Sequence, residues 1–130
     1  MKFKHLVLLN SLVLFLFGAA FMVRPFDMVA LYGVVQNAWG VTGLLAVTLV
    51  GFGLVLSSIA YTVPAERQKP VAVALLLANL IAFGISMAQQ QALWNTRMGW
   101  VTAGVYLFFV FGYGWLAVRG TASRHAATRA

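Results

Sequence analysis

Four long apolar runs take up most of this 130-residue chain. Each has about 18 or more residues, the length at which an α-helix spans about 30 Å of hydrocarbon. Each is bounded by charged residues, a proline or a polar cluster, and little chain remains for a soluble domain. The sequence therefore predicts four transmembrane helices, at residues 6–23, 39–61, 71–88 and 99–118.

The composition supports the same class of protein. Hydrophobic residues make up 62% of the chain and charged residues 8%, which is too apolar for a soluble domain of this size. We expect an all-α fold, an integral membrane four-helix bundle formed by residues 1–118 as one domain. Residues 119–130 are small, polar and basic, so we expect them to form a mobile cytoplasmic tail that is drawn to anionic lipids.

The start of the chain has an alternative interpretation, a secretory signal. Lys2 and Lys4 precede an apolar core, and Gly18-Ala19-Ala20 has the small residues of a cleavage site. The apolar run, however, continues through Val23 and so reaches the length of a membrane span. We therefore expect the first helix to be retained.

The basic residues predict the orientation of the four spans. Lys and Arg are kept in short cytoplasmic segments, and an even number of spans places both termini on one side. Seven basic residues fall on the terminal side and two on the other, which predicts a multi-pass protein with both termini in the cytoplasm. The seven are Lys2, Lys4, Arg67, Lys69, Arg119, Arg124 and Arg129, and the two are Arg24 and Arg97.

One phrase occurs twice in the chain. Residues 41–53 read VTGLLAVTLVGFG, and residues 101–114 read VTAGVYLFFVFGYG. The two copies lie in the second and fourth spans, which suggests two repeated helical hairpins of the same orientation. Chance similarity stays open as an alternative, because Gly, Val, Leu and Phe are common in all membrane helices.

The glycines of these copies predict which helix faces pack together. At about 100° per residue, Gly40, Gly43 and Gly51 share one side of the second span, and Gly104 and Gly112 share one side of the fourth. Small residues allow helices in a membrane to approach closely. We expect both glycine sides to point into the bundle, with Gly53 on the opposite side of its helix.

A few polar residues lie within the predicted spans. Asn10 is in the first span, and Asn79, Ser86 and Gln90 share one face of the third. Such side chains form hydrogen bonds with neighbouring helices, or they line the path of a solute. The first interpretation is favoured, because amides in membrane helices more often join helices than conduct.

Residues that carry reaction chemistry are missing from the predicted hydrocarbon region. It contains no Asp, Glu, Lys, Arg or His, and the chain has no cysteine. His5 and His125 lie at or beyond the interface, where they would not serve as axial ligands of a buried haem. We therefore expect no catalytic site, no metal site and no cofactor. Although the net charge is +7, its basic residues sit at helix ends, so nucleic acid is not expected as a partner.

A short helix is predicted on the outer side, between the first two spans. Pro25 suits the first position of a helix, Asp27 lies in its first turn, and Gly33 follows its end. We expect this helix to lie at the membrane interface.

The pattern as a whole resembles small four-helix bacterial inner-membrane proteins of unassigned function. This resemblance implies a fold and a membrane location but no activity, and no site residue follows from it. It rests on Asn10, Gly18, Pro25, Gly33, Gly43, Gly51 and Gly53.

Three functions are compatible with these observations. The leading hypothesis is a non-catalytic membrane protein that packs against other membrane subunits or against itself, because no ionisable residue in the spans suggests chemistry. The second is a channel or carrier for a small neutral or hydrophobic solute, based on the polar face of the third span. The third is a binder of a lipid, quinone or pigment, based on the aromatic side chains around the fourth span.

Overall fold

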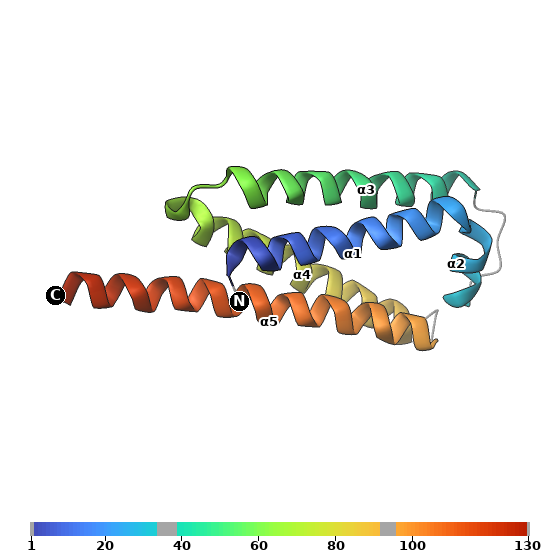
Figure 1. Cartoon of the computed structure of the whole chain (residues 1–130). Coiled ribbons are helices and arrows are strands. Elements are labelled where there is room, and N and C mark those ends of the chain that lie inside the picture. The colour runs from blue at the N-terminus through green and yellow to red at the C-terminus, as the bar shows by residue number, and fades with distance from the viewer. Residues whose placement is uncertain (1, 34–38, 92–95, 130) are drawn as a thin grey trace.

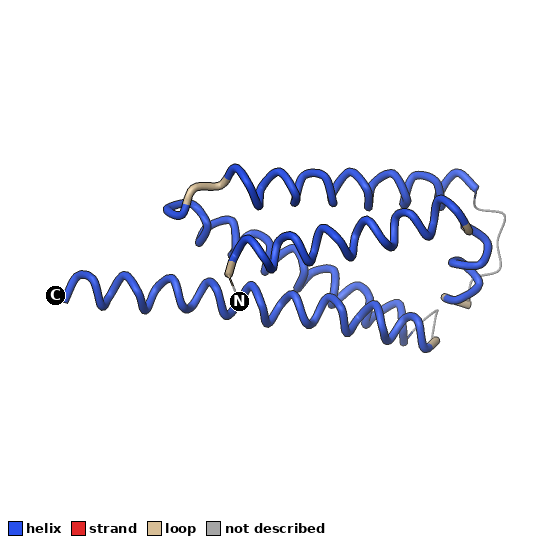
Figure 2. Tube along the Cα trace, in the orientation of Figure 1, coloured by secondary structure: helices blue, strands red, loops and turns tan. Residues whose placement is uncertain are grey.

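The computed structural model describes residues 2–33, 39–91 and 96–129, and every regular element within these ranges is a helix. Four long helices run side by side and alternate in direction, so the all-α bundle predicted from the sequence is confirmed (Figures 1 and 2). The elements are α1 (Phe3–Val23), α2 (Pro25–Leu31), α3 (Trp39–Thr62), η1 (Ala65–Arg67), α4 (Gln68–Gln89) and α5 (Arg97–Arg129).

The four long helices have the length and apolar composition of membrane spans. The chain is therefore a multi-pass membrane protein. Both ends of the chain point toward the same end of the bundle (Figure 1). We call this the termini end, and we call the opposite end, where α1 passes into α2 and α5 begins, the α2 end.

The short helix α2 begins and ends for local reasons. Pro25 takes its first position, where a helix needs no backbone N–H, and Gly33 follows it with a φ of 73°, a value that glycine adopts without strain. Arg24 and Asp27 form an ion pair of 3.5 Å at its start. Both side chains are largely exposed, so this pair orients the turn and adds little stability.

The helices pack as two hairpins. α1 packs along α3, and α4 packs along α5, while the two hairpins meet mainly where α1 contacts α5. In the first hairpin, the buried hydroxyl of Ser11 donates to the carbonyl oxygen of Gly53 at 2.7 Å and lies 2.6 Å from the hydroxyl of Ser57. These bonds join α1 to α3 at a depth where water is scarce.

The main core lies toward the termini end and draws on all four long helices. Leu6 and Val7 of α1 contact Phe109 and Tyr113 of α5, and each of these side chains is at most 2% exposed. Leu56 and Ala60 of α3 and Ala72 of α4 complete the cluster. Because lipid tails are as apolar as these side chains, close packing is what holds the hairpins together here.

The prediction that the glycine sides face inward is wrong for most of the described glycines. A Cβ atom at Gly43, Gly51 or Gly104 would meet no atom within 4 Å, so no helix of the bundle packs closely on these three, and Gly104 borders a groove with Leu9 and Val13 of α1. Gly112 does face inward, and a Cβ there would lie 2.8 Å from the side chain of Leu6. Gly40 lies outside the residues whose surroundings the structure describes.

Gly53, which was expected to face outward, is buried. A Cβ at this position would lie 3.1 Å from the ring of Phe15 on α1. The side of α3 that meets α1 is set by Ala46, Leu56 and Ala60, all at most 8% exposed, and Gly53 falls on that side. Gly43 and Gly51 lie on the other side of the same helix.

The C-terminal segment is also different from the expectation. No helix was predicted there, whereas residues 119–129 continue α5 as a helix that extends well beyond the other three (Figure 1). This segment is rich in alanine, the residue with the highest helix propensity, and contains no proline that would end the helix.

Candidate functional site

A cavity of about 490 Å³ lies between the two hairpins. Its walls come from α1, α3, α4 and α5, and Val29 and Tyr32 of the α2 segment contribute at the α2 end. Most of the wall is apolar, with Leu14, Phe17 and Leu49 on one hairpin and Ala82 and Val105 on the other. Cavities of this size and character commonly bind small hydrophobic molecules.

The cavity opens toward the lipid-facing surface. Two of its lining residues, Leu45 of α3 and Ile85 of α4, are 41% and 54% exposed. They come from different hairpins, and α3 and α4 do not pack along each other. The opening therefore lies between α3 and α4, where a molecule dissolved in the bilayer can enter sideways.

Polar side chains gather at the α2 end of the cavity. Tyr32 and Thr102 lie there with 2.6 Å between their hydroxyl oxygens. The Thr102 hydroxyl donates to the carbonyl oxygen of Met98 at 3.0 Å, so the Tyr32 hydroxyl donates to Thr102. Burial raises the pKa of Tyr32, and the bond to Thr102 partly lowers it. This pair joins the α2 segment to α5. Ser86 and Gln89 of α4 line the same end.

The deep end of the cavity is closed by a second link between the hairpins. The side-chain amide of Asn10 donates to the hydroxyl of Tyr113 at 3.0 Å. Tyr113 is fully buried, and its ring stacks on Phe109, which also lines the cavity. Asn10 thus bridges α1 and α5 below the cavity.

The four polar residues that the sequence places within the spans are all buried, but they form different contacts. Asn79 donates to the carbonyl oxygen of Leu75 in its own helix at 2.8 Å, so it does not bridge two helices. Ser86 is 5% exposed and lines the cavity. Gln90 is 1% exposed and donates to the carbonyl oxygen of Thr96 at 2.8 Å, which ties the end of α4 to the start of α5.

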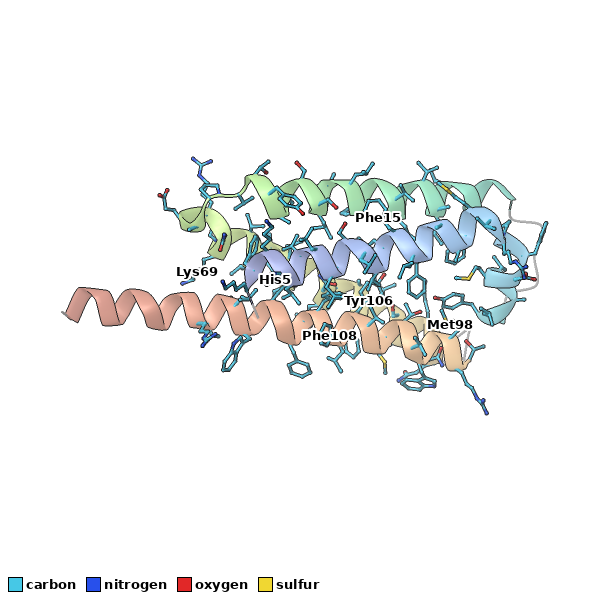
Figure 3. The ribbon with its side chains drawn as sticks, viewed as in Figure 1. His5, Phe15, Lys69, Met98, Tyr106 and Phe108 are labelled. Atoms are coloured by element: carbon cyan, nitrogen blue, oxygen red, sulfur yellow. The ribbon has the colours of Figure 1, made fainter. Side chains whose placement is uncertain are left out.

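Several lining residues were not identified from the sequence. Tyr106 was counted among the aromatic residues of the fourth span, yet it lines the cavity and points toward the space between α1 and α5 (Figure 3). Phe108 is 49% exposed and borders a separate groove with Leu9 and Val13 of α1. Tyr32 and Thr102 carried no signal, because each is an ordinary residue near the end of an element. Gln89 belongs to a run of three glutamines that only suggested a wet helix end.

Among the described residues that line the cavity there is no Asp, Glu, Lys, Arg or His. Among the residues that the structure describes, no three or more side chains of the metal-ligating types cluster together. The arrangement offers hydrogen bonds and apolar contact to a ligand.

Comparisons with known proteins add no relative to this picture. No protein-family model matches the chain, and no curated protein or solved structure shows significant similarity to it.

Proposed function

We propose that the chain is a non-catalytic integral membrane protein that binds a hydrophobic molecule from the bilayer in the cavity between its hairpins. The observation that carries this proposal is the largely apolar cavity of about 490 Å³, open toward lipid between α3 and α4. The uncharged lining supports binding over catalysis, because acid–base chemistry in a membrane calls for ionisable side chains.

The surroundings of the cavity favour a hydrophobic occupant over water. A buried water molecule is held by about three hydrogen bonds, and the middle of this cavity offers mostly hydrocarbon. A lipid chain or another apolar molecule fills such a space and gains dispersion contacts with Leu14, Phe17 and Val105.

Photochemical labelling of the cavity tests this function. The chain is placed in lipid nanodiscs with dodecane that carries a photoreactive diazirine, and labelled peptides are mapped by mass spectrometry. We expect labels on cavity residues, and we expect Ala82→Phe to remove them by filling the space. Ala88→Phe, at an exposed position about 120° around α4 from Ala82, is the matched control. Labelling that avoids the cavity, or that survives Ala82→Phe, would overturn the proposal.

A second function, packing against other membrane subunits or a second copy, is favoured by the outward-facing glycines. Gly43 and Gly51 on α3 leave open space where a Cβ would stand. Such positions allow another helix to approach closely in a bilayer. Because these glycines make no close contact within the chain, leucine at Gly51 should leave the fold intact and weaken only association.

Native mass spectrometry from mild detergent tests the second function. We expect wild type to carry a second copy or a partner subunit, and we expect Gly43→Leu and Gly51→Leu to release it. Gly84→Leu, which also faces open space but lies on α4, serves as the control. A wild-type chain that is monomeric and without partner would contradict this function.

We also propose that both termini face the cytoplasm of a bacterium with the chain in its inner membrane. The support is the seven-to-two division of basic residues. Lys4 lies 4.3 Å from the ring centre of Tyr61, and Arg119 lies 5.8 Å from that of Trp115, so aromatic and basic side chains gather at the termini end as at a membrane interface. Alkaline phosphatase fused to the C-terminus should be inactive, and a fluorescent protein there should be bright.

A further inference from the structure

The polar side chains of the cavity are unevenly distributed along its length. Ser86 lies three residues before the end of α4, so it is about 5 Å from the α2 end of that helix. Asn10 lies thirteen residues before the end of α1, about 20 Å from the same end. Between these depths the lining is hydrocarbon, apart from the phenol of Tyr106 and the hydroxyl of Thr102, which is bonded to Met98 and Tyr32. The cavity therefore has a polar end and a long apolar interior.

Unused hydrogen-bonding groups are found at the polar end. Tyr32 and Thr102 are bonded to each other, and Asn10 is bonded to Tyr113 at the deep end. The hydroxyl of Ser86, a residue that is only 5% exposed, and the amide of Gln89 form no hydrogen bond with the residues that the structure describes. Because Ser86 and Gln89 line the cavity, a ligand group that forms hydrogen bonds with their side chains is stabilised there.

The charge of the lining restricts the ligand. In the described part of the lining, no cationic side chain balances a phosphate or carboxylate, and no acidic one balances an amine. Moving an unpaired charge into such surroundings is strongly unfavourable. The polar group of the ligand must therefore be neutral.

The available groups also select the kind of neutral ligand. A serine hydroxyl and a glutamine amide each contain a donor and an acceptor. A ligand hydroxyl both donates and accepts, so it can pair with Ser86 and with either atom of the Gln89 amide. A carbonyl only accepts, and it would leave the oxygen of that amide unpaired.

We infer that the cavity holds a neutral amphiphile whose hydroxyl group lies between Ser86 and Gln89 and whose hydrocarbon chain runs toward Asn10. This inference rests on the proposed function, because it requires the cavity to bind a membrane molecule. The ligand class is a lipid alcohol. Its orientation is that of a lipid in the leaflet at the α2 end, and it enters between α3 and α4.

Three photoreactive probes of equal chain length test the inference: dodecanol, dodecane and dodecyl phosphate. Each carries a diazirine at one end of its chain, which in dodecanol and dodecyl phosphate is the end farthest from the head group. In nanodiscs with the wild-type chain, we expect dodecanol to give the strongest labelling. Its labels should fall on deep residues such as Val13, Leu14 and Phe109.

The variant Ser86→Ala gives a second readout. Loss of one hydrogen bond should lower dodecanol labelling about threefold to tenfold. Dodecane labelling should stay unchanged, which also shows that the variant folds. Ser58→Ala, at an exposed position of α3, should change neither.

The outcomes separate this inference from the function on which it rests. If dodecane fails to label the cavity, the proposed function itself fails. If dodecane labels the cavity and dodecanol shows no preference, or if dodecyl phosphate labels best, the hydroxyl ligand is wrong. Dodecanol labels on Val29 or Gln89 would reverse the orientation of the ligand.

Discussion

The two halves of the bundle are built from the same four helices and pack differently. At the termini end, Leu6, Val7 and Tyr113 are at most 1% exposed and fill the space between the hairpins. At the α2 end, the same hairpins enclose a cavity of about 490 Å³. Each of the four helices is apolar enough along its length to span a membrane, so hydrophobicity alone does not decide whether a membrane bundle is solid or hollow.

The difference arises where α1 meets α5. Gly112 leaves room for the side chain of Leu6, so the two helices contact closely at the termini end. Toward the α2 end, Phe17 and Tyr106 line the space without filling it. In a soluble protein an empty space of this size would reduce stability. In a bilayer, a cavity that opens to lipid can be occupied by the surrounding hydrocarbon.

The most direct test of this difference in packing is to place the same large side chain in each half of the bundle. Ala72 is 1% exposed in the packed core, and Ala82 lines the cavity on the same helix. Ala72→Phe should destabilise the fold by about 3 kcal/mol through overpacking, whereas Ala82→Phe should change stability by less than about 1 kcal/mol. Thermal unfolding in detergent measures both. Equal losses would show that the two halves are packed alike.

A second comparison concerns the contact between α1 and α5. Gly112→Leu should cost about 2 kcal/mol, because its side chain would enter the space held by Leu6. Gly104→Leu, two turns earlier on the same helix, should cost less than about 0.5 kcal/mol, since a side chain there meets open space. Thermal unfolding in detergent measures the loss of stability in both variants. A greater loss at Gly104 would show that α5 has been placed with the wrong side inward.

The smallest expected effects concern the two hydrogen bonds that join the hairpins. Tyr113→Phe leaves the Asn10 amide without its partner and should cost about 1 to 1.5 kcal/mol. Tyr32→Phe should cost about 0.5 kcal/mol, because Thr102 keeps its bond to the carbonyl of Met98. A double-mutant cycle of Asn10→Leu with Tyr113→Phe isolates the deep bond. Additive effects in that cycle would mean that the bond adds no stability.

The helices were predictable from the sequence because their signals are local. Apolar runs of spanning length predicted the four long helices, and Pro25 and Gly33 predicted the bounds of α2. Asn79, Ser86 and Gln90 could be named from their shared helical face, and the structure buries all three. Each of these predictions depends on the spacing of residues within one element.

The orientation of α3 was not predictable in the same way. Three glycines on one side suggested a packing face, but the side that meets α1 carries Ala46, Gly53 and Leu56. Both sides contain small residues, so helical periodicity alone could not choose between them. The choice depends on α1, where Phe15 and Gly18 are complementary to the observed side of α3.

The cavity could not be predicted from any one segment. Its lining comes from five parts of the chain, and its existence depends on how far the hairpins separate toward the α2 end. Asn10 could be named as a polar residue, but its partner Tyr113 is more than a hundred positions away in the sequence. Such pairings are set by the tilt and rotation of whole helices, which the sequence pattern does not specify.

The helical continuation of α5 has a practical consequence for imaging this molecule. From Arg119 to Arg129 the helix extends for about 15 Å past the apolar span. A chain of 130 residues is a difficult target for single-particle microscopy, because almost all of it is hidden in a detergent belt. A soluble protein joined in helical register after Arg129 would be held at a fixed distance and rotation from the four spans. The helix would then act as a rigid handle through which particles could be aligned.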